Sequence, residues 1–143
     1  MQMKETMESA STSCPAAKTA LEAHSDQDLR VPCYCEENVW RLAYRRLHFR
    51  DDQNLHYYVL FISNPNKCVP MFQQLAAKDR RTPVFWDYHV ILLETHHADK
   101  TNRQARVLDI DSHLPYECAL PEYVRQTFPD CQESTKEFAP MFR

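Results

Sequence analysis

Cys35 is the first residue whose position suggests chemistry, because the segment after it, Glu36–Leu47, has the pattern of an amphipathic helix. A thiol at a helix N-terminus faces unpaired backbone N–H groups and the positive end of the helix dipole, which together favour a thiolate. The same N–H groups can stabilise an oxyanion on an attacked carbonyl. Glu36 and Glu37 oppose a thiolate, so a nucleophilic role for Cys35 requires a cationic neighbour. The alternative is that Cys35 is a small buried hydrophobic residue.

His89 is a candidate for this cationic neighbour. It lies inside Val84–Thr95, the strongest strand pattern in the chain, and alternation places its side chain on the same face as Asp87 and Ile91. A cysteine paired with a histidine recurs in enzymes whose thiol attacks an amide. A histidine in an apolar strand is also commonly a hydrogen-bonded core residue, and the pattern alone leaves both interpretations open.

An acidic residue would complete the arrangement. Asp109 lies on the predicted strand Ala105–Asp111, which we expect to pair with the strand that carries His89. A carboxylate there can accept a hydrogen bond from the imidazole, fix its tautomer and favour the imidazolium form. Asp111 is two residues further along the same strand face, and the residues alone do not separate the two aspartates.

Zinc binding is a competing use of the same residue types. Structural zinc sites commonly use pairs of cysteines with the spacing C-x₂₋₄-C. This sequence has one C-x-C and no second pair, so the spacing does not favour zinc. The residues that could contribute ligands are Cys33, Cys35, Cys68, Cys118 and His113.

The elements that must position these residues form an α+β pattern, in which one helix is followed by strands that we expect to pair antiparallel. A second, short helix begins at a proline, and one short strand is interrupted at Pro70. The predicted helices are Glu36–Leu47 and Pro121–Phe128, and the predicted strands are His56–Ile62, Lys67–Gln74, Val84–Thr95 and Ala105–Asp111.

Two predictions concern burial. Val39, Trp40, Ala43 and Leu47 recur on one face of the first helix and are predicted to form its buried stripe. The apolar run His56–Ile62 predicts a strand of buried type.

The sequence has 143 residues and no glycine, which excludes several kinds of binding site. The phosphate loop of NTPases, the dinucleotide-binding turn and the nucleophile elbow of α/β-hydrolases all require glycine, because its backbone tolerates positive φ and close approach. Tight turns are therefore expected to use Asn, Asp and the nine prolines.

The rest of the composition predicts one domain. Residues 1–29 contain no aromatic side chain and are predicted to be a disordered tail, which leaves 30–143 as the domain. A net charge of −3 offers no basic surface for nucleic acid or anionic membranes, and the apolar runs are too short to cross a bilayer. No secretory signal is recognisable, so the six cysteines are expected to be reduced thiols in the cytosol.

Four segments in collinear order resemble the protein N-terminal glutamine amidohydrolase family. They are P-C-Y-C-E-E-N-V-W at 32–40, V-L-F-I-S-N at 59–64, P-V-F-W-D-Y-H-V-I-L-L at 83–93, and L-D-I-D at 108–111 followed by Leu114-Pro115. The resemblance extends over about residues 32–128, and C-Y-C-E-E-N and W-D-Y-H-V are its most specific motifs.

This resemblance implies a papain- or transglutaminase-like fold with the helix that carries the nucleophile packed on an antiparallel sheet. The implied activity is hydrolysis of the side-chain amide of an N-terminal glutamine, which yields N-terminal glutamate and ammonia in the arginylation branch of the N-degron pathway. The resemblance implies Cys35 as nucleophile, His89 as base and Asp109, rather than Asp111, as the orienting acid. It implies no metal and no organic cofactor.

A substrate recognised by its N-terminus must be distinguished from an internal glutamine through its free α-ammonium group. A carboxylate is therefore expected in the pocket, and Glu36 and Asp87 are the candidates because they lie within the two most specific motifs.

Members of the family extend further beyond the last motif than this chain, so we expect the domain 30–143 to be incomplete at its C-terminus. The alternative function is a non-catalytic protein that binds N-terminal peptides or partners without hydrolysing them. We expect a monomer in the cytoplasm, and also in the nucleus, whose partners are proteins or peptides with N-terminal glutamine and not nucleic acid or membranes.

Overall fold

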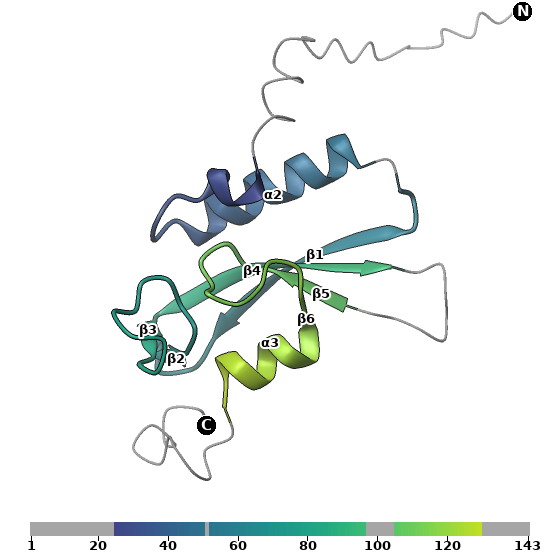
Figure 1. Ribbon diagram of the computed structural model, residues 1–143. Helices are drawn as coiled ribbons and strands as arrows, with labels where there is room; N and C mark the ends of the chain where they lie inside the picture. Colours follow the sequence, from purple (N-terminus) through teal and green to yellow (C-terminus); the bar gives the residue numbers. More distant parts are fainter. Residues whose placement is uncertain (1–24, 51, 97–104, 130–143) are drawn as a thin grey trace, which may run out of the picture.

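The computed structural model describes residues 25–50, 52–96 and 105–129, and in these residues two helices lie on opposite faces of an antiparallel sheet (Figure 1). The predicted α+β class and antiparallel pairing are confirmed. Residues 1–24 of the predicted tail, 1–29, lie outside the described residues. Its last residues form a short 3-10 helix, η1 (Asp26–Leu29).

The main sheet has the strand order β1-β4-β5-β6, and all of its neighbours are antiparallel. Two long strands pair along their whole length, and two short strands extend the sheet on the other side of β4. The strands are β1 (Leu55–Ser63), β4 (Tyr88–His96), β5 (Ala105–Leu108) and β6 (Cys118–Ala119).

The segment predicted as one strand, Val84–Thr95, is two strands that meet at Asp87. The first part, β3 (Val84–Trp86), pairs with β2 (Val69–Met71) in a separate two-stranded sheet, and the second part is β4. Pro70 does not interrupt β2, because this short strand has only one neighbour and proline is tolerated in such edge strands.

The first helix, α2 (Cys35–Phe49), is longer than predicted, and its predicted buried stripe is wrong in part. Trp40 is 66% exposed and Leu47 is 64% exposed. Two polar residues, Asn38 and Arg46, take inward positions, where Asn38 bonds to the buried carboxylate of Asp111 and Arg46 pairs with the partly buried carboxylate of Glu117. A prediction from hydrophobicity alone counts both residues as outward, so the predicted buried face of α2 is rotated relative to the observed one. The residues that α2 buries are Cys35, Asn38, Val39, Leu42 and Arg46.

β1 was expected to be a buried strand, and this prediction is wrong. It is an edge strand, and α2 packs on β4, leaving one face of β1 uncovered. Val59 is 50% exposed and Phe61 is 67% exposed for this reason.

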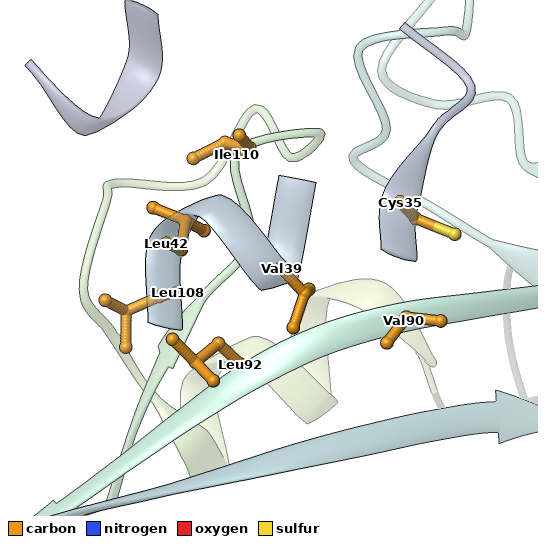
Figure 2. Close-up of a cluster of buried hydrophobic side chains, with 7 residues drawn as sticks. All are labelled: Cys35, Val39, Leu42, Val90, Leu92, Leu108 and Ile110. Carbon is orange, nitrogen blue, oxygen red and sulfur yellow. The ribbon is translucent and has the colours of Figure 1, made fainter. Parts of the chain in front are cut away.

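Apolar side chains fill the space on each side of the sheet. Figure 2 shows the cluster between α2 and the sheet, which consists of Cys35, Val39, Leu42, Val90, Leu92, Leu108 and Ile110. The second cluster lies toward α3 (Leu120–Thr127), the second helix, and its buried members are Val69, Met71, Ile91, Val107, Cys118 and Tyr123. No helix in the described part of the chain has the length and apolar character needed to cross a bilayer.

A buried ion network fixes the C-terminal half of α2. Arg46 is 5% exposed and forms ion pairs with Asp26 of η1, with Glu117 at 2.9 Å (Nη2–Oε1) and with Glu94 of β4 at 3.6 Å (Nη1–Oε2). The network therefore connects η1, the sheet and the segment before β6 through one guanidinium group.

The described turn after β1 is built from Asn64, Pro65 and Asn66, as the sequence predicts, but none of the described residues with positive φ is Asn or Asp. The described residues with positive φ are Cys33 (66°), Lys67 (49°), Gln73 (59°) and Glu117 (59°). A side chain with a Cβ in this region costs about 1–2 kcal/mol per residue, because Cβ approaches the following carbonyl oxygen.

Candidate active site

Cys35 begins α2 and is 6% exposed. The residue before it, Tyr34, has extended-type φ and makes no side-chain capping hydrogen bond, so no side chain at the N-cap covers the first-turn amides. Figure 2 shows the sulfur of Cys35 directed away from Leu42 and Leu108, two of the other members of the cluster. The thiol therefore lies at a helix N-terminus that the N-cap side chain does not cover.

His89 lies on β4 and its side chain is fully buried. One face of the ring stacks on Trp86, with 5.3 Å between ring centroids, and Nε2 donates to Oδ2 of Asp109 at 3.3 Å. Nδ1 is also buried and has no partner with hydrogen-bond geometry among the described residues. Its imidazole is therefore oriented by Asp109 and leaves Nδ1 available.

The environment of His89 favours the imidazolium form. Burial by itself lowers the pKa of His89, but the hydrogen bond to Asp109 and the charges of Asp109 and Cys35 outweigh burial and raise the pKa from 6.5 to about 10. The Cys35 thiol therefore lies close enough to the ring to interact with it. The structure brings together the three residues Cys35, His89 and Asp109.

Asp109 lies immediately after β5, in a turn and not on the predicted strand Ala105–Asp111. Its Oδ2 accepts hydrogen bonds from His89 and from the hydroxyl of Tyr123 at 2.7 Å, and its Oδ1 accepts from the backbone N–H of Asp111 at 3.0 Å. Burial raises the pKa of Asp109, but these donors and the charge of His89 outweigh burial and hold the pKa below its ordinary value.

Asp111, the alternative acid, faces a different set of partners. Its Oδ1 accepts from Nε of Arg30 at 2.7 Å, and its Oδ2 accepts from Nδ2 of Asn38 at 3.0 Å. Asn38 is on α2, four residues from Tyr34, and also bonds both backbone polar groups of Val31. The carboxylate of Asp111 thus joins the start of α2 to the turn that contains Asp109.

Glu36 and Asp87, the predicted substrate-binding carboxylates, both accept hydrogen bonds from Tyr88. The hydroxyl of Tyr88 donates to Oε1 of Glu36 at 2.5 Å, and the backbone N–H of Tyr88 donates to Oδ1 of Asp87 at 2.9 Å. The hydrogen bond to Glu36, burial and the charges of Glu36, Cys35 and Asp87 raise the pKa of Tyr88 to about 12. Both carboxylates are exposed and lie at the Cys35 end of β4.

Comparison with known proteins places this chain in a family. The sequence profile of the N-terminal glutamine amidase family matches residues 30–143. The chain belongs to this family. The resemblance that the motifs predict is therefore confirmed.

Curated relatives of the N-terminal glutamine amidase family are similar over most of this chain. The proteins named protein N-terminal glutamine amidohydrolase from Bos taurus and from Danio rerio are both 37% identical, over 78% and 82% of this chain and 51% and 54% of their own lengths. The protein of the same name from Drosophila ananassae is 38% identical over 68% of this chain and 46% of its own length. The chain spans about half the length of the curated relatives that it matches.

Tyr123 also belongs to the site, although it lies outside the motifs from which the site residues were predicted. It is 1% exposed, on α3, and lies one helical turn before the buried Thr127. Its hydrogen bond to Asp109 joins α3 to the turn after β5, and no pattern of neighbouring residues predicts such a contact.

The zinc alternative has no support in the part of the chain that the structure describes. No group of three or more His, Cys, Asp or Glu side chains there is arranged to hold a metal ion. Cys35 and Cys118 belong to clusters on opposite sides of the sheet. The four cysteines in this part of the chain, Cys33, Cys35, Cys68 and Cys118, are free thiols.

Proposed function

We propose that this chain hydrolyses the side-chain amide of an N-terminal glutamine in proteins or peptides, producing N-terminal glutamate and ammonia. The observation that carries the proposal is the placement of Cys35 at an uncapped helix N-terminus beside a buried His89 that Asp109 orients. Membership of the N-terminal glutamine amidase family and the names of the relatives support the choice of substrate. In this proposal Cys35 is the nucleophile, His89 the acid and base, and Asp109 the orienting acid.

The first half of the reaction forms a thioester. The Cys35 thiolate attacks Cδ of the glutamine side chain, and the amide oxygen becomes an oxyanion that first-turn N–H groups of α2 stabilise. The imidazolium of His89 donates its Nδ1 proton to the amide nitrogen, so that the C–N bond breaks and ammonia leaves. Cys35 is then acylated and His89 is neutral.

The second half restores the thiol. Neutral His89 takes a proton from a water molecule, whose oxygen attacks the thioester carbonyl. The C–S bond breaks, the N-terminal glutamate leaves, and the Cys35 thiolate and the His89 imidazolium form again. The raised pKa of His89 favours the first half, which needs the charged ring.

Recognition of the α-ammonium group is assigned to Glu36 and Asp87. Both carboxylates are exposed. Glu36 follows Cys35 directly and accepts from the Tyr88 hydroxyl, and Asp87 accepts from the Tyr88 backbone N–H, two residues before His89. A carboxylate at this place pairs with a free N-terminus and not with an internal peptide N–H.

The wider setting of the proposal is a papain- or transglutaminase-like core acting in the arginylation branch of the N-degron pathway. The expected protein is a monomer located in the cytoplasm and the nucleus.

Ammonia release from short peptides tests the proposal. A Gln-initiated peptide is expected to release ammonia, whereas an Asn-initiated peptide and an N-acetylated Gln peptide are not. Cys35→Ala is expected to abolish release, and the matched variant Cys33→Ala, which changes an exposed thiol two residues away, is expected to retain it. Equal release from all three peptides, or unchanged release by Cys35→Ala, would refute the proposal.

A second candidate function is binding of N-terminal peptides without hydrolysis. It is favoured by the exposed carboxylates of Glu36 and Asp87, which can pair with a free N-terminus without any chemical step. Calorimetry with the same Gln-initiated peptide distinguishes the two: saturable binding with no ammonia in the product supports binding alone, and stoichiometric ammonia with glutamate excludes it.

A further inference from the structure

We propose that Tyr123 is a positioning residue that weakens the hold of Asp109 on the proton of His89, so that His89 can also act as a base. This inference rests on the roles proposed above for His89 and Asp109.

The geometry shows one acceptor atom with two donors. Oδ2 of Asp109 accepts from the hydroxyl of Tyr123 at 2.7 Å and from Nε2 of His89 at 3.3 Å, while Oδ1 accepts from the Asp111 backbone. The shorter bond is the one to Tyr123. Donors that share an oxygen compete for its electron density, so the hydroxyl reduces what the imidazolium gains from the carboxylate.

Among the residues that the structure describes, Asp109 is the carboxylate that contacts the ring. The titratable groups that face His89 are the Cys35 thiol from α2 and Asp109 from the turn after β5, and Tyr123 from α3 faces Asp109. The carboxylate of Asp111 is directed to Arg30 and Asn38.

The two half-reactions place opposite demands on His89. Thioester formation uses the protonated ring, which Asp109 and the Cys35 thiolate stabilise. Thioester hydrolysis uses the neutral ring, and at that stage Cys35 carries no charge, so Asp109 alone opposes deprotonation. A donor that takes part of the Oδ2 charge lowers the pH at which His89 becomes a base.

An NMR titration of His89 tests this inference without requiring turnover. Cys35→Ala imitates the loss of the thiolate charge, and the comparison is between this variant and Cys35→Ala combined with Tyr123→Phe, which deletes one hydroxyl from a buried ring. The His89 pKa is expected to be higher in the double variant by about half a unit or more, because Asp109 then has one donor fewer. Disappearance of the signal in a further His89→Gln protein assigns it.

Tyr116→Phe in the Cys35→Ala protein is the matched control. Tyr116 also donates a largely buried hydroxyl to a carboxylate, that of Asp26, at 2.8 Å, but it lies in a different network. The His89 pKa is expected to be unchanged by this control. An unchanged or lowered His89 pKa in the Tyr123→Phe protein, or an equal rise in the Tyr116→Phe protein, would overturn the inference.

If Tyr123→Phe does not fold, a variant that strengthens the hydrogen bond to Asp109 tests the same inference, with the opposite expected change in the His89 pKa. A fluorinated tyrosine placed at position 123 is a stronger hydrogen-bond donor, and it is expected to lower the His89 pKa. A rise would overturn the inference. In a protein that turns over, Tyr123→Phe is expected to keep the first stoichiometric release of ammonia and to slow the later steady-state release, with the acid limb of its pH profile moved to higher pH. These kinetic readouts fail if the proposed function is wrong, whereas the titration does not depend on it.

Discussion

Asp109→Asn removes a buried charge that His89 faces while nearly preserving the shape of the side chain. Burial lowers the pKa of His89, and Asp109 and Cys35 together raise it from 6.5 to about 10. Without the Asp109 carboxylate, burial is opposed only by Cys35, and the pKa of His89 is expected to fall by about 3 units. At 1.36 kcal/mol per unit this corresponds to about 4 kcal/mol of lost stabilisation of the imidazolium.

The same shift predicts how stability depends on pH. Because the pKa of His89 is higher in the folded state than in the unfolded state, its proton stabilises the fold fully below about pH 6.5, and this contribution is lost as the pH rises toward 10. One extra bound proton corresponds to a slope of up to about 1.4 kcal/mol per pH unit in this window. The slope is expected in the wild-type chain and is expected to disappear in Asp109→Asn.

Urea denaturation at intervals from about pH 6 to about pH 10 measures the slope, and NMR titration measures the pKa of His89 directly. The matched control is Asp79→Asn, which removes the same charge from an exposed residue paired with Arg81. If Asp109→Asn retained the slope of this control, or if its His89 titrated near pH 10, the ion pair would not be the source of the raised pKa.

Three further predictions concern stability and are measured by urea denaturation. Lys67→Gly is expected to stabilise the fold by about 0.5 kcal/mol, because relief of about 1–2 kcal/mol of Cβ strain at positive φ exceeds an entropic cost of about 0.5–1 kcal/mol; a loss would show that no strain is relieved. Arg46→Met is expected to cost about 3–5 kcal/mol, whereas Arg41→Met, in an exposed pair, is expected to cost less than about 1 kcal/mol. Leu42→Ala is expected to cost about 2–5 kcal/mol and Trp40→Ala about 1 kcal/mol or less, and the reverse order would place Trp40 in the core.

The order of elements could be predicted from local patterns because each has its own signal. Two glutamates in the first turn and Arg46 and His48 in the last mark the ends of α2, and the predicted helix differs from it by one residue at the start and two at the end. The longest apolar strand pattern contains β4. These signals depend on neighbouring residues, which is why they are readable without the fold.

The buried faces could not be predicted in the same way. Asn38 and Arg46 are inward because Asp111 and Glu117, more than 70 positions away, bond to them, and β1 is exposed because α2 lies over β4. Such contacts leave no periodic signal. A polar side chain counts as outward in any hydrophobicity pattern, whether or not the fold provides it with a partner.

The residues of the candidate site also differ in how far the sequence could predict them. The type and local position of Cys35 and His89 were enough to mark both as candidates, but the choice between Asp109 and Asp111 required the family resemblance. The structure separates them physically, since one carboxylate contacts the imidazole and the other contacts Arg30. Tyr123 could not be marked as part of the site, because a tyrosine on a short helix is common and its bond to Asp109, on another element, leaves no local pattern.

The contact between Asn38 and Asp111 bears on how substitutions in this protein combine. It joins positions 73 residues apart, and through the Asp111 backbone it continues to Asp109. A change at the start of α2 and a change in the turn after β5 therefore act on one shared set of bonds, so their free-energy effects will not add. A survey that replaces one residue at a time will attribute to the helix some defects that originate in the turn, and pairs of substitutions are needed to divide the effect correctly.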